Sequence, residues 1–281
     1  MARAARREIR IAIDTGGTFT DCVWAAGSAL KTLKVFSTPD DPSRAIAEAL
    51  EKIGVAENFT LLHGTTVGTN ALLQRKGARV ALITTAGFED VIEIGRQARS
   101  QLYNFFFERV PPLVPRDLRF GINERISADG QALETPSVEG VNRLREVVAS
   151  ANVEAIAISL LFSFAKPDHE IAVAAALGNL GKPLSVSHQI LPEFREYERT
   201  STVVVNAYLQ PLMQSYLQKI GERAKNLGKR SQAANLVPRI FVMQSSGGIT
   251  SLDSAAREPV RTVLSGPAGG LVGAAAMASR S

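Results

Sequence analysis

Cysteine is nearly absent from this sequence, since Cys22 is the only one among 281 residues. One cysteine forms no disulfide within the chain, and its scarcity is typical of a reducing compartment, so we expect a cytoplasmic protein. Histidine is also scarce, with three copies that lie far apart in the sequence. Their spacing matches neither a zinc site nor a local catalytic triad, so the pattern supports neither kind of chemistry.

Long apolar runs and a strong charge excess are missing as well. No stretch is long enough to cross a bilayer, and the basic N-terminus alternates into Asp14 as a first strand would, unlike a signal peptide. The net charge of +5 is modest, and no long basic helix or interleaved aromatic residues accompany it. We therefore expect neither a membrane nor a nucleic acid as a partner, and one large or two ordinary globular domains.

The first third of the sequence alternates between strand and helix patterns. Isoleucines at every second position of residues 9–14 predict a strand, and two more strands up to residue 36 complete a three-stranded meander. A helix follows, with Asp41 as its N-cap, Pro42 at its first position and Gly54 at its end. After it we expect the strand FTLLH, a helix from Thr65 to Gly77, the buried strand RVALITT and the helix FEDVIEIG.

The remainder of the sequence begins with an irregular stretch. Residues 96–136 contain four prolines and show no clear period, which predicts a long insertion. Alternation then resumes, and the fold class it predicts is α/β. A long helix over 197–224 contains Pro211, where we expect a kink. The other expected elements are helices over 137–151 and 167–181, strands over 154–164 and 183–190, a strand and turn over 239–248, and a closely packing helix of small residues over 265–281.

The stretch DTGGTFTD follows the first strand directly and carries phosphate-binding residue types. Gly16 and Gly17 permit a tight turn and a close approach of the backbone to an anion, because they lack a Cβ. Thr18 and Thr20 add hydroxyl donors. The alternative is a hairpin in which the same residues serve only the turn.

Two carboxylates flank that turn. Asp14 stands at the carboxyl end of the predicted strand, where α/β folds place their ligands. Asp14 and Asp21 together are suited to Mg²⁺, which prefers one or two carboxylates beside phosphate oxygens.

The second candidate is HGTT, residues 63–66, between a strand and a helix. Thr65 or Thr66 is the expected N-cap, and the turn Gly64-Thr65-Thr66 is suited to an anion. For His63 alone we favour a structural role, with its ring nitrogens bonded inside the core.

Four further stretches allow two readings each. Arg96 and Arg99, with Tyr103 nearby, could clamp an anion, but a solvated helix face is the commoner explanation. The charged residues over 193–199 favour a structural network at a domain interface, and Asn206 needs a partner if it is buried. Residues 243–251 form either a second phosphate or nucleoside loop or a plain hairpin. For LSGPAGG, with Gly269, Gly270 and Gly273 nearby, we favour close packing over an anion site.

Taken together, these stretches resemble the hydantoinase A/5-oxoprolinase family, the ATP-using subunits of hydantoinases, oxoprolinases and acetone-type carboxylases. The likeness covers nearly the whole chain and rests on motifs in a fixed order: IAIDTGGTFTD, HGTTVGTNALLQRKGARVALITTAGFEDVIEIGRQAR, YERTSTVVVNAYLQP, MQSSGGI and VLSGPAGGLVGAAA. It implies the RNase H-like ATPase fold of actin, Hsp70 and sugar kinases. It also implies an N-terminal region over 1–190 and the start of a core domain over 191–281, which ends in a helix at the hinge between two lobes.

The resemblance also implies a reaction. DTGGTFTD would be the first phosphate loop, with Asp14 as the metal-proximal catalytic residue and with ATP and Mg²⁺ as cofactors. Phosphorylation of a lactam or imide carbonyl would then allow water to open the ring of a small cyclic amide, with a B-type hydantoinase subunit as partner. The same motifs suit a carboxylase subunit that phosphorylates a ketone or bicarbonate, so this alternative stays open.

One feature departs from the family pattern. The family carries a second Asp-Gly-Gly-Thr loop after the small-residue helix, whereas the only D-x-G-G-T here begins at Asp14 and the sequence stops at Ser281. We therefore expect an incomplete second lobe, with the missing half belonging to the same protein or to another chain. A third hypothesis follows from this departure, namely a binding module that turns over no ATP.

Overall fold

The computed structural model describes residues 9–27, 29–55, 58–98, 103–107, 110–230 and 238–279. The chain forms two compact units, of which the first joins Met1–Gln74 to Leu212–Ser281 and the second is Arg75–Pro211. The first unit is therefore assembled from both ends of the sequence and the second from its middle. Among the described residues, no helix combines the length and the apolar character that a membrane span needs.

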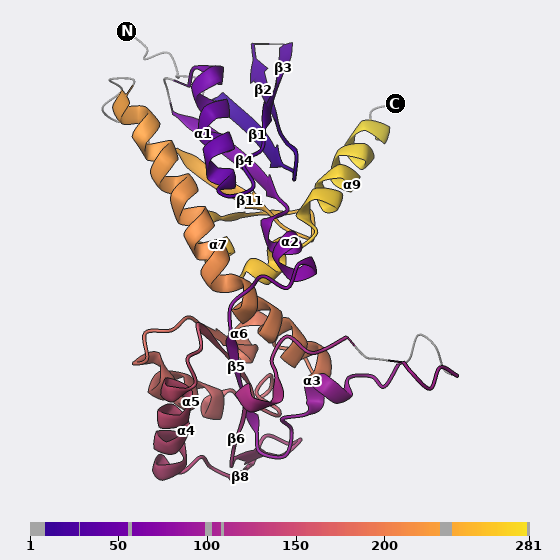
Figure 1. The fold of residues 1–281 in the computed structure, drawn as a ribbon, viewed down its shortest axis with the longest axis vertical. Helices are drawn as coiled ribbons and strands as arrows, with labels where there is room; N and C mark the ends of the chain where they lie inside the picture. Colours follow the sequence, from indigo (N-terminus) through magenta and orange to yellow (C-terminus); the bar gives the residue numbers. More distant parts are fainter. Residues whose placement is uncertain are drawn as a thin grey trace. The chain divides into compact units, whose positions relative to one another are not determined.

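The first unit is built on a six-stranded mixed sheet (Figure 1). The predicted meander is confirmed, because its three strands pair antiparallel in sequence order. The next two strands run parallel to the first and extend the sheet on its other side, and a short antiparallel strand closes that edge. In spatial order the strands are β12 (Ile249–Ser251), β11 (Arg239–Met243), β4 (Phe59–Thr65), β1 (Ile9–Thr15), β2 (Phe19–Ala26) and β3 (Ala29–Phe36).

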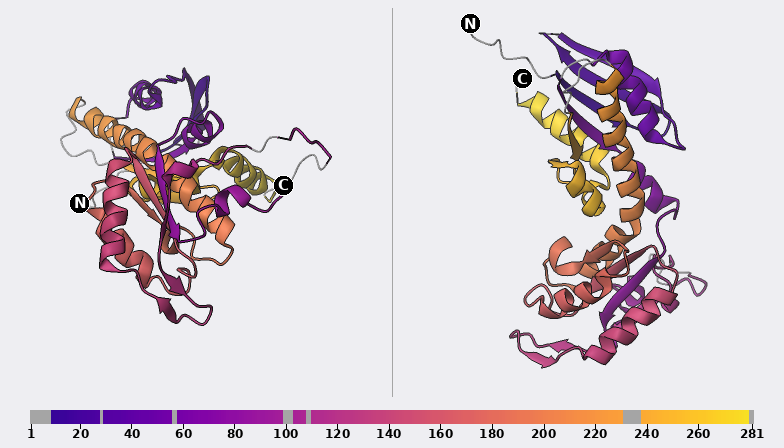
Figure 2. Two further views of the ribbon diagram at one scale, coloured as in Figure 1. Left: turned by 60° about the horizontal axis from the view of Figure 1, so that its bottom comes forward. Right: turned by 90° about the vertical axis from the view of Figure 1, so that its left-hand side faces the viewer.

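Helix α1 (Pro42–Ile53) packs against the meander (Figures 1 and 2). Its predicted ends are confirmed: the Asp41 side chain accepts a bond from the backbone N–H of Ser43, and Gly54 adopts the left-handed conformation with φ of 73°. The following helix, α2 (Val67–Leu73), is shorter than predicted and does not reach Gly77. Arg75 has φ of 55°, a left-handed conformation that no α-helix continues, which explains the early end.

The last part of the first unit is helical. Helices α8 (Leu252–Arg257) and α9 (Ser265–Ala278) flank a short 3-10 turn, η2 (Pro259–Thr262). Helix α7 (Glu196–Arg230) is 35 residues long and continues through Pro211, and its part from Leu212 on belongs to this unit. The predicted long helix is therefore confirmed and extended. The kink expected at Pro211 stays a prediction.

The core of the first unit lies on one face of the sheet. Along β1, Ile11 and Ile13 are buried, whereas the alternate residues, including Asp14, are exposed. Tyr216 and Ile220 of α7 are buried as well, and Tyr216 bonds to His63 of β4, which places α7 on the face of the buried isoleucines. Because side chains alternate along a strand, Asp14 points to the opposite face.

The second unit has a four-stranded sheet in which every pairing is parallel. Two helices that pack side by side, α4 (Val138–Ser150) and α5 (Asp168–Gly178), accompany it (Figure 1). In spatial order the strands are β10 (Leu184–Val186), β9 (Ala155–Ser159), β5 (Val80–Thr85) and β6 (Arg119–Ile122). The smaller elements are α3 (Val91–Ile94), α6 (Ser187–Ile190), the 3-10 turn η1 (Arg116–Leu118) and the ribbon of β7 (Arg125–Ile126) with β8 (Ala132–Glu134).

Three predictions are wrong in detail here. Residues 96–136 are not irregular throughout, because they include β6, which joins the sheet, and the β7–β8 ribbon. The strand expected over 183–190 ends at Val186, and the helical turn α6 follows it. The buried carboxylate of Glu170, on α5, accepts bonds from the Ser187 hydroxyl and the His188 backbone N–H of this turn. The helix FEDVIEIG is one turn, α3, that ends at Gly95.

Candidate functional site

The two glycine-containing turns that the sequence singles out lie side by side in the first unit. Strands β1 and β4 are parallel neighbours, with Asp14 opposite Gly64 and Thr15 opposite Thr65. Both turns therefore leave the carboxyl edge of the sheet together. This edge is where a mixed α/β sheet places a ligand.

Two carboxylates share the face of the sheet at this edge. Asp21 of β2 lies directly across from Asp14, and cross-strand partners project to the same side. Partial desolvation of the Asp14 carboxylate by its neighbours raises its pKa, although the residue is exposed as a whole, and the negative charge of Asp21 raises it further. Asp21 itself is 3.1 Å from Nζ of Lys34. A cation bound beside Asp14 would offset the repulsion from Asp21, which is the smaller of the two causes of the raised pKa.

Gly64 leaves room for the Asp14 carboxylate. A Cβ at this position would lie 2.8 Å from Oδ1 of Asp14, which is closer than such atoms approach. A side chain at position 64 would therefore push the Asp14 carboxylate out of the place it occupies beside the neighbouring strand. This is a contact between the two motifs that sequence alone does not reveal.

The turn Gly16-Gly17 is supported from inside. The N–H of Gly16 donates to Phe19 O at 3.0 Å, and Ser37 Oγ donates to Gly16 O at 2.8 Å. Thr20 is buried, and its hydroxyl lies 3.0 Å from Ser37 Oγ, so it holds the turn from below.

The outer side of this turn is open. A Cβ at Gly17 would meet no atom of the described residues within 4 Å, and Thr18 is exposed. Among the predicted phosphate-cradle residues of DTGGTFT, Gly17 and Thr18 are thus the two that face outward.

In the GTT turn the two threonines have different roles. Thr66 occupies the N-cap position of α2, but Thr65 supplies the capping bond, because its Oγ1 accepts from Val67 N at 3.2 Å. The Thr66 hydroxyl donates to Thr15 O at 3.2 Å and so ties the two turns together. Thr65 is buried, whereas Thr66 is half-buried.

The start of α9 joins the same edge, which the sequence analysis missed. Ser265 is buried, and its hydroxyl donates to Thr65 O at 3.3 Å. The Leu264 N–H donates to Oγ1 of Thr69 at 3.0 Å. The sequence LSGPAGG predicted a helix start at this point. It did not reveal that this helix start would contact the end of β4.

The packing role predicted for the α9 glycines is confirmed at one position. A Cβ at Gly269 would lie 2.5 Å from the Met243 sulfur, so a side chain there would displace the Met243 side chain of β11. At Gly270 and Gly273 a Cβ would meet no described atom within 4 Å, so the packing role of these two stays a prediction.

His63 has the structural role that the sequence favoured. It is buried, with Nδ1 at 3.3 Å from Ile13 O and Nε2 at 2.8 Å from the Tyr216 hydroxyl. Since a carbonyl only accepts, Nδ1 carries the proton, and Nε2 accepts from Tyr216. Burial lowers the pKa of His63 to about 4, which keeps the ring neutral.

Three of the remaining polar candidates, Arg96, Arg199 and Asn206, lie in the second unit and have internal partners. Arg96 pairs with Glu198 through Nε at 2.8 Å, while Arg99 lies outside the described residues. Arg199 is buried and donates to the Glu193 and Leu160 carbonyls at 2.8 and 2.9 Å. The buried Asn206 donates to Ser185 Oγ at 2.9 Å, so the partner that we required is present. The location of this network at a domain interface stays a prediction.

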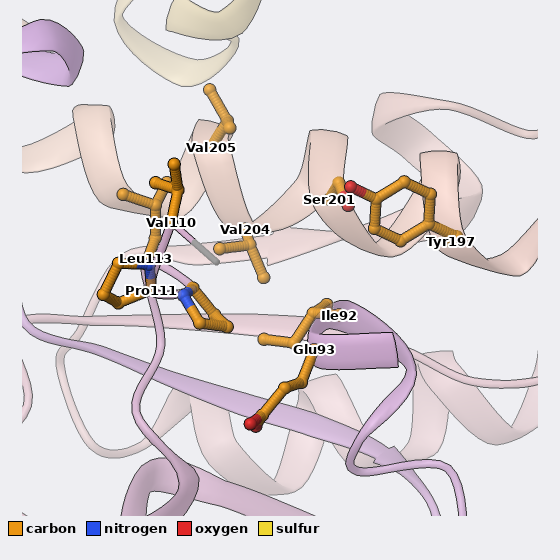
Figure 3. A pocket seen from close by; sticks show the side chains of 10 residues that line it. Ile92, Glu93, Val110, Pro111, Leu113, Tyr197, Ser201, Val204 and Val205 are labelled. Atoms are coloured by element: carbon orange, nitrogen blue, oxygen red, sulfur yellow. The ribbon is translucent and has the colours of Figure 1, made fainter. Parts of the chain in front are cut away.

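A pocket of about 560 Å³ also lies in the second unit (Figure 3). Its walls are mostly apolar and come from α3, from residues 110–113 and from α7. Tyr197 and Ser201, one helical turn apart on α7, add two hydroxyl groups to the wall. Neither this pocket nor any other cluster of described residues brings together three metal-binding side chains of the His, Cys, Asp or Glu type.

Comparison with known proteins shows which family has these two glycine-containing turns. The profile of the hydantoinase/oxoprolinase N-terminal region matches residues 10–181, and the hydantoinase/oxoprolinase profile matches residues 199–281. The caprolactamase alpha subunit of Pseudomonas jessenii is 34% identical over 94% of this chain and 39% of its own. The 5-oxoprolinase of Saccharomyces cerevisiae is 30% identical over 94% of this chain and 23% of its own.

The fold is shared with solved structures as well. The nucleotide-free structure of acetone carboxylase superimposes with a TM-score of 0.82 at 28% identity, over 97% of this chain and 41% of that one. The chain thus spans less than half the length of these relatives. Since the two profiles cover most of the sequence and include both glycine-containing turns, the chain belongs to the hydantoinase/oxoprolinase family.

Proposed function

We propose that this chain is the nucleotide-handling part of an ATP-dependent enzyme that opens cyclic amides. One observation carries the proposal: Asp14 stands at the carboxyl end of β1, with Gly64 clearing space for its carboxylate. The names of the relatives support it, because caprolactamase and 5-oxoprolinase both act on lactams. A family-level ATPase fold of the actin type is part of the same proposal and is supported by the meander followed by alternating helices and strands.

The residues present fit a magnesium–nucleotide complex. Asp14 and Asp21 provide the one or two carboxylates that Mg²⁺ uses when phosphate oxygens supply the rest of its shell. The raised pKa of Asp14, caused by partial burial and then by the charge of Asp21, is consistent with a cation at this position. An all-protein metal cage is not formed by the described residues, which suits a cation that arrives with the nucleotide.

Each residue at the edge then has a distinct task. Asp14, with Asp21 beside it, holds the cation, and Gly17 and Thr18 present backbone N–H groups and a hydroxyl toward phosphate oxygens. Gly16 and Thr20 keep the turn in shape, while Gly64, Thr65 and Thr66 fix the neighbouring turn against it. ATP supplies the phosphoryl group that activates an amide carbonyl toward water, and Mg²⁺ supplies positive charge for that transfer.

The remaining parts of the proposal concern the whole protein. We infer a cytoplasmic enzyme with a small cyclic amide as substrate and a B-type hydantoinase subunit as partner. A further segment of the same protein or another chain would supply the second phosphate loop. The division into a region over 1–190 and a core domain over 191–281 belongs to the same proposal.

A carboxylase subunit is the second candidate. The structural match to acetone carboxylase, with a TM-score of 0.82, favours it specifically. Substrate-stimulated ATP hydrolysis by the complete enzyme separates the two. Stimulation by lactams or hydantoins supports the amidohydrolase, and stimulation by acetone or acetophenone supports the carboxylase.

The first experiment is calorimetric titration of the chain with MgATP. We expect binding by the wild type and a loss of at least about tenfold in Asp14→Asn, which keeps the shape but removes the charge. Asp40→Asn is the matched control, since Asp40 is an exposed aspartate of the same unit. Equal binding by wild type and Asp14→Asn would contradict the role of Asp14, and a wild type that binds no MgATP would favour the non-enzymatic module.

A further inference from the structure

The parallel sheet of the second unit has an open edge at β6. This strand is the last in the spatial order, and it pairs with β5 alone among the described strands. The C=O of Ile122 accepts from Ala86 N at 2.9 Å, on the β5 side. Because the polar groups of successive strand residues point to opposite sides, the N–H and C=O of Gly121 and Asn123 point away from the sheet. No hydrogen bond from the described part of the chain reaches these outward groups.

A groove of about 380 Å³ follows this edge. Residues 119–123 line it without a break, and α4 with its N-cap supplies the other wall. A Cβ at Gly121 would point at Glu89, so Phe120 and Ile122 project from the opposite face of the strand. The α4 side of the groove consists of Ser137, Gly140, Arg143, Leu144 and Val147. The groove thus joins free backbone groups on one wall to apolar side chains and one cation on the other.

The sequence does little to keep another chain from this edge. The edge strand of the first unit, β3, carries Lys31 and Lys34, a residue type that discourages edge pairing. Residues 119–123 contain neither lysine nor proline. Since β6 has only four residues, the backbone available for pairing matches a short linear segment better than a whole strand of another sheet.

The charge of the groove selects the kind of segment. Its charged lining residues are Arg119 and Arg143, and no carboxylate lines it. Arg119 is buried and already bonded to two carboxylates at α3. Arg143 is exposed and forms no ion pair with any described residue; Glu139 and Glu146, one turn away on α4, are exposed as well. An acidic side chain in the groove therefore meets a guanidinium that is free to take it in a two-pronged bond.

We propose that this groove binds a short extended peptide segment of a partner protein by strand addition to β6. The backbone of the segment pairs with Gly121 and Asn123. Its acidic and apolar side chains, at every second position, contact Arg143 and the pair Leu144 and Val147. A second copy of this chain is a poor occupant, because joining two β6 edges brings two basic grooves together. The groove lies wholly in the second unit, so the proposal is independent of the nucleotide site at Asp14.

The first test is selection of a phage-displayed library of random peptides, about ten residues long, on the full chain. We expect the enriched peptides to share an acidic residue with apolar residues two positions away. Arg143→Glu should weaken binding of a selected synthetic peptide at least about tenfold, measured by fluorescence polarisation. Arg145→Glu is the matched control, because this arginine of the same helix does not line the groove.

Methylation of the peptide's own amide nitrogens tests strand addition without altering the protein. Every second amide of an added strand faces β6, so methylation of that set should weaken binding at least about tenfold, and methylation of the intervening set should leave it nearly unchanged. Equal effects of the two sets would overturn the proposal, as would a library that yields no peptide with a preference for the wild type over Arg143→Glu. A wild-type dimer that Arg143→Glu dissociates, seen by analytical ultracentrifugation, would assign the groove to a second copy and would also overturn it.

Discussion

Asp14 and Gly64 face each other across the parallel pair β1–β4, and the aspartate carboxylate occupies the space that a side chain at 64 would need. The separation between Oδ1 of Asp14 and a Cβ at position 64 would be 2.8 Å. The two residues come from motifs 50 positions apart in the sequence. The absence of a side chain at Gly64 accounts for the position of the Asp14 carboxylate: the DTGG aspartate takes this place because HGTT has a glycine there.

Gly64→Ala should therefore impair the nucleotide site through Asp14. The added methyl group displaces the carboxylate without removing its charge, and we expect MgATP binding to weaken about tenfold, or about 1.4 kcal/mol, by calorimetry. Gly178→Ala is the matched control, because a Cβ at the end of α5 would meet no described atom within 4 Å. Unchanged binding in Gly64→Ala would show that the position of Asp14 does not matter to the nucleotide.

The sequence predicted the ends of a helix correctly where the residues that set those ends lie within one turn of it. Asp41, Pro42 and Gly54 delimit α1 because a cap, a fixed φ and a left-handed residue act within one turn. β6 escaped prediction because four residues, Arg119–Ile122, among prolines have no period of their own, and their pairing with β5 makes them a strand. The Asp14–Gly64 contact escaped for the same reason, since it depends on which strands become neighbours.

A pair of adjacent aspartates tests how much the α1 cap contributes. Asp41 accepts from Ser43 and from Arg223 of α7 at 2.7 Å, whereas Asp40 makes only an exposed pair with Arg44. We expect Asp41→Ala to lower the free energy of unfolding by about 1–2 kcal/mol and Asp40→Ala by at most about 0.5 kcal/mol. Urea unfolding followed through Trp24, the only tryptophan and a residue of the first unit, measures both. Equal losses would mean that the cap and the Arg223 bond add nothing.

Glu170 should be the most sensitive polar position of the second unit. It is fully buried, and its carboxylate accepts from Leu160 N, Ser187 Oγ and two His188 nitrogens at 2.6–3.1 Å. Glutamine replaces one acceptor oxygen with a donor, so at least one of these donors loses its partner. We expect Glu170→Gln to cost about 2–4 kcal/mol, seen as faster amide hydrogen exchange in the second unit. The exposed Glu139→Gln serves as control, and equal protection in the two variants would contradict this role.

The sequence did not predict which polar residues of the second unit are buried. Glu124, Glu170 and His169 are buried, yet each looks like an ordinary surface residue in its stretch. Glu124 accepts from the Thr85 hydroxyl and from His169, so β5, the loop between β6 and β7, and α5 share one network. A carboxylate can be buried only where donors from other segments bond to it, and a single sequence does not show which segments come together.

His63 should make the first unit less stable in mild acid. Its pKa is about 4 in the folded protein and near 6.5 in the unfolded chain, because burial disfavours the charged ring. Between these values the unfolded state binds more protons, so stability is unaffected above about pH 6.5 and falls as the pH drops toward 4. At pH 5 the loss is about 2 kcal/mol from this residue. Urea unfolding of wild type and His63→Gln at pH 7 and pH 5, read through Trp24, should show that the variant lacks this extra loss. An identical pH dependence in the two proteins would mean that His63 is protonated in the folded state or that its ring is not buried in solution.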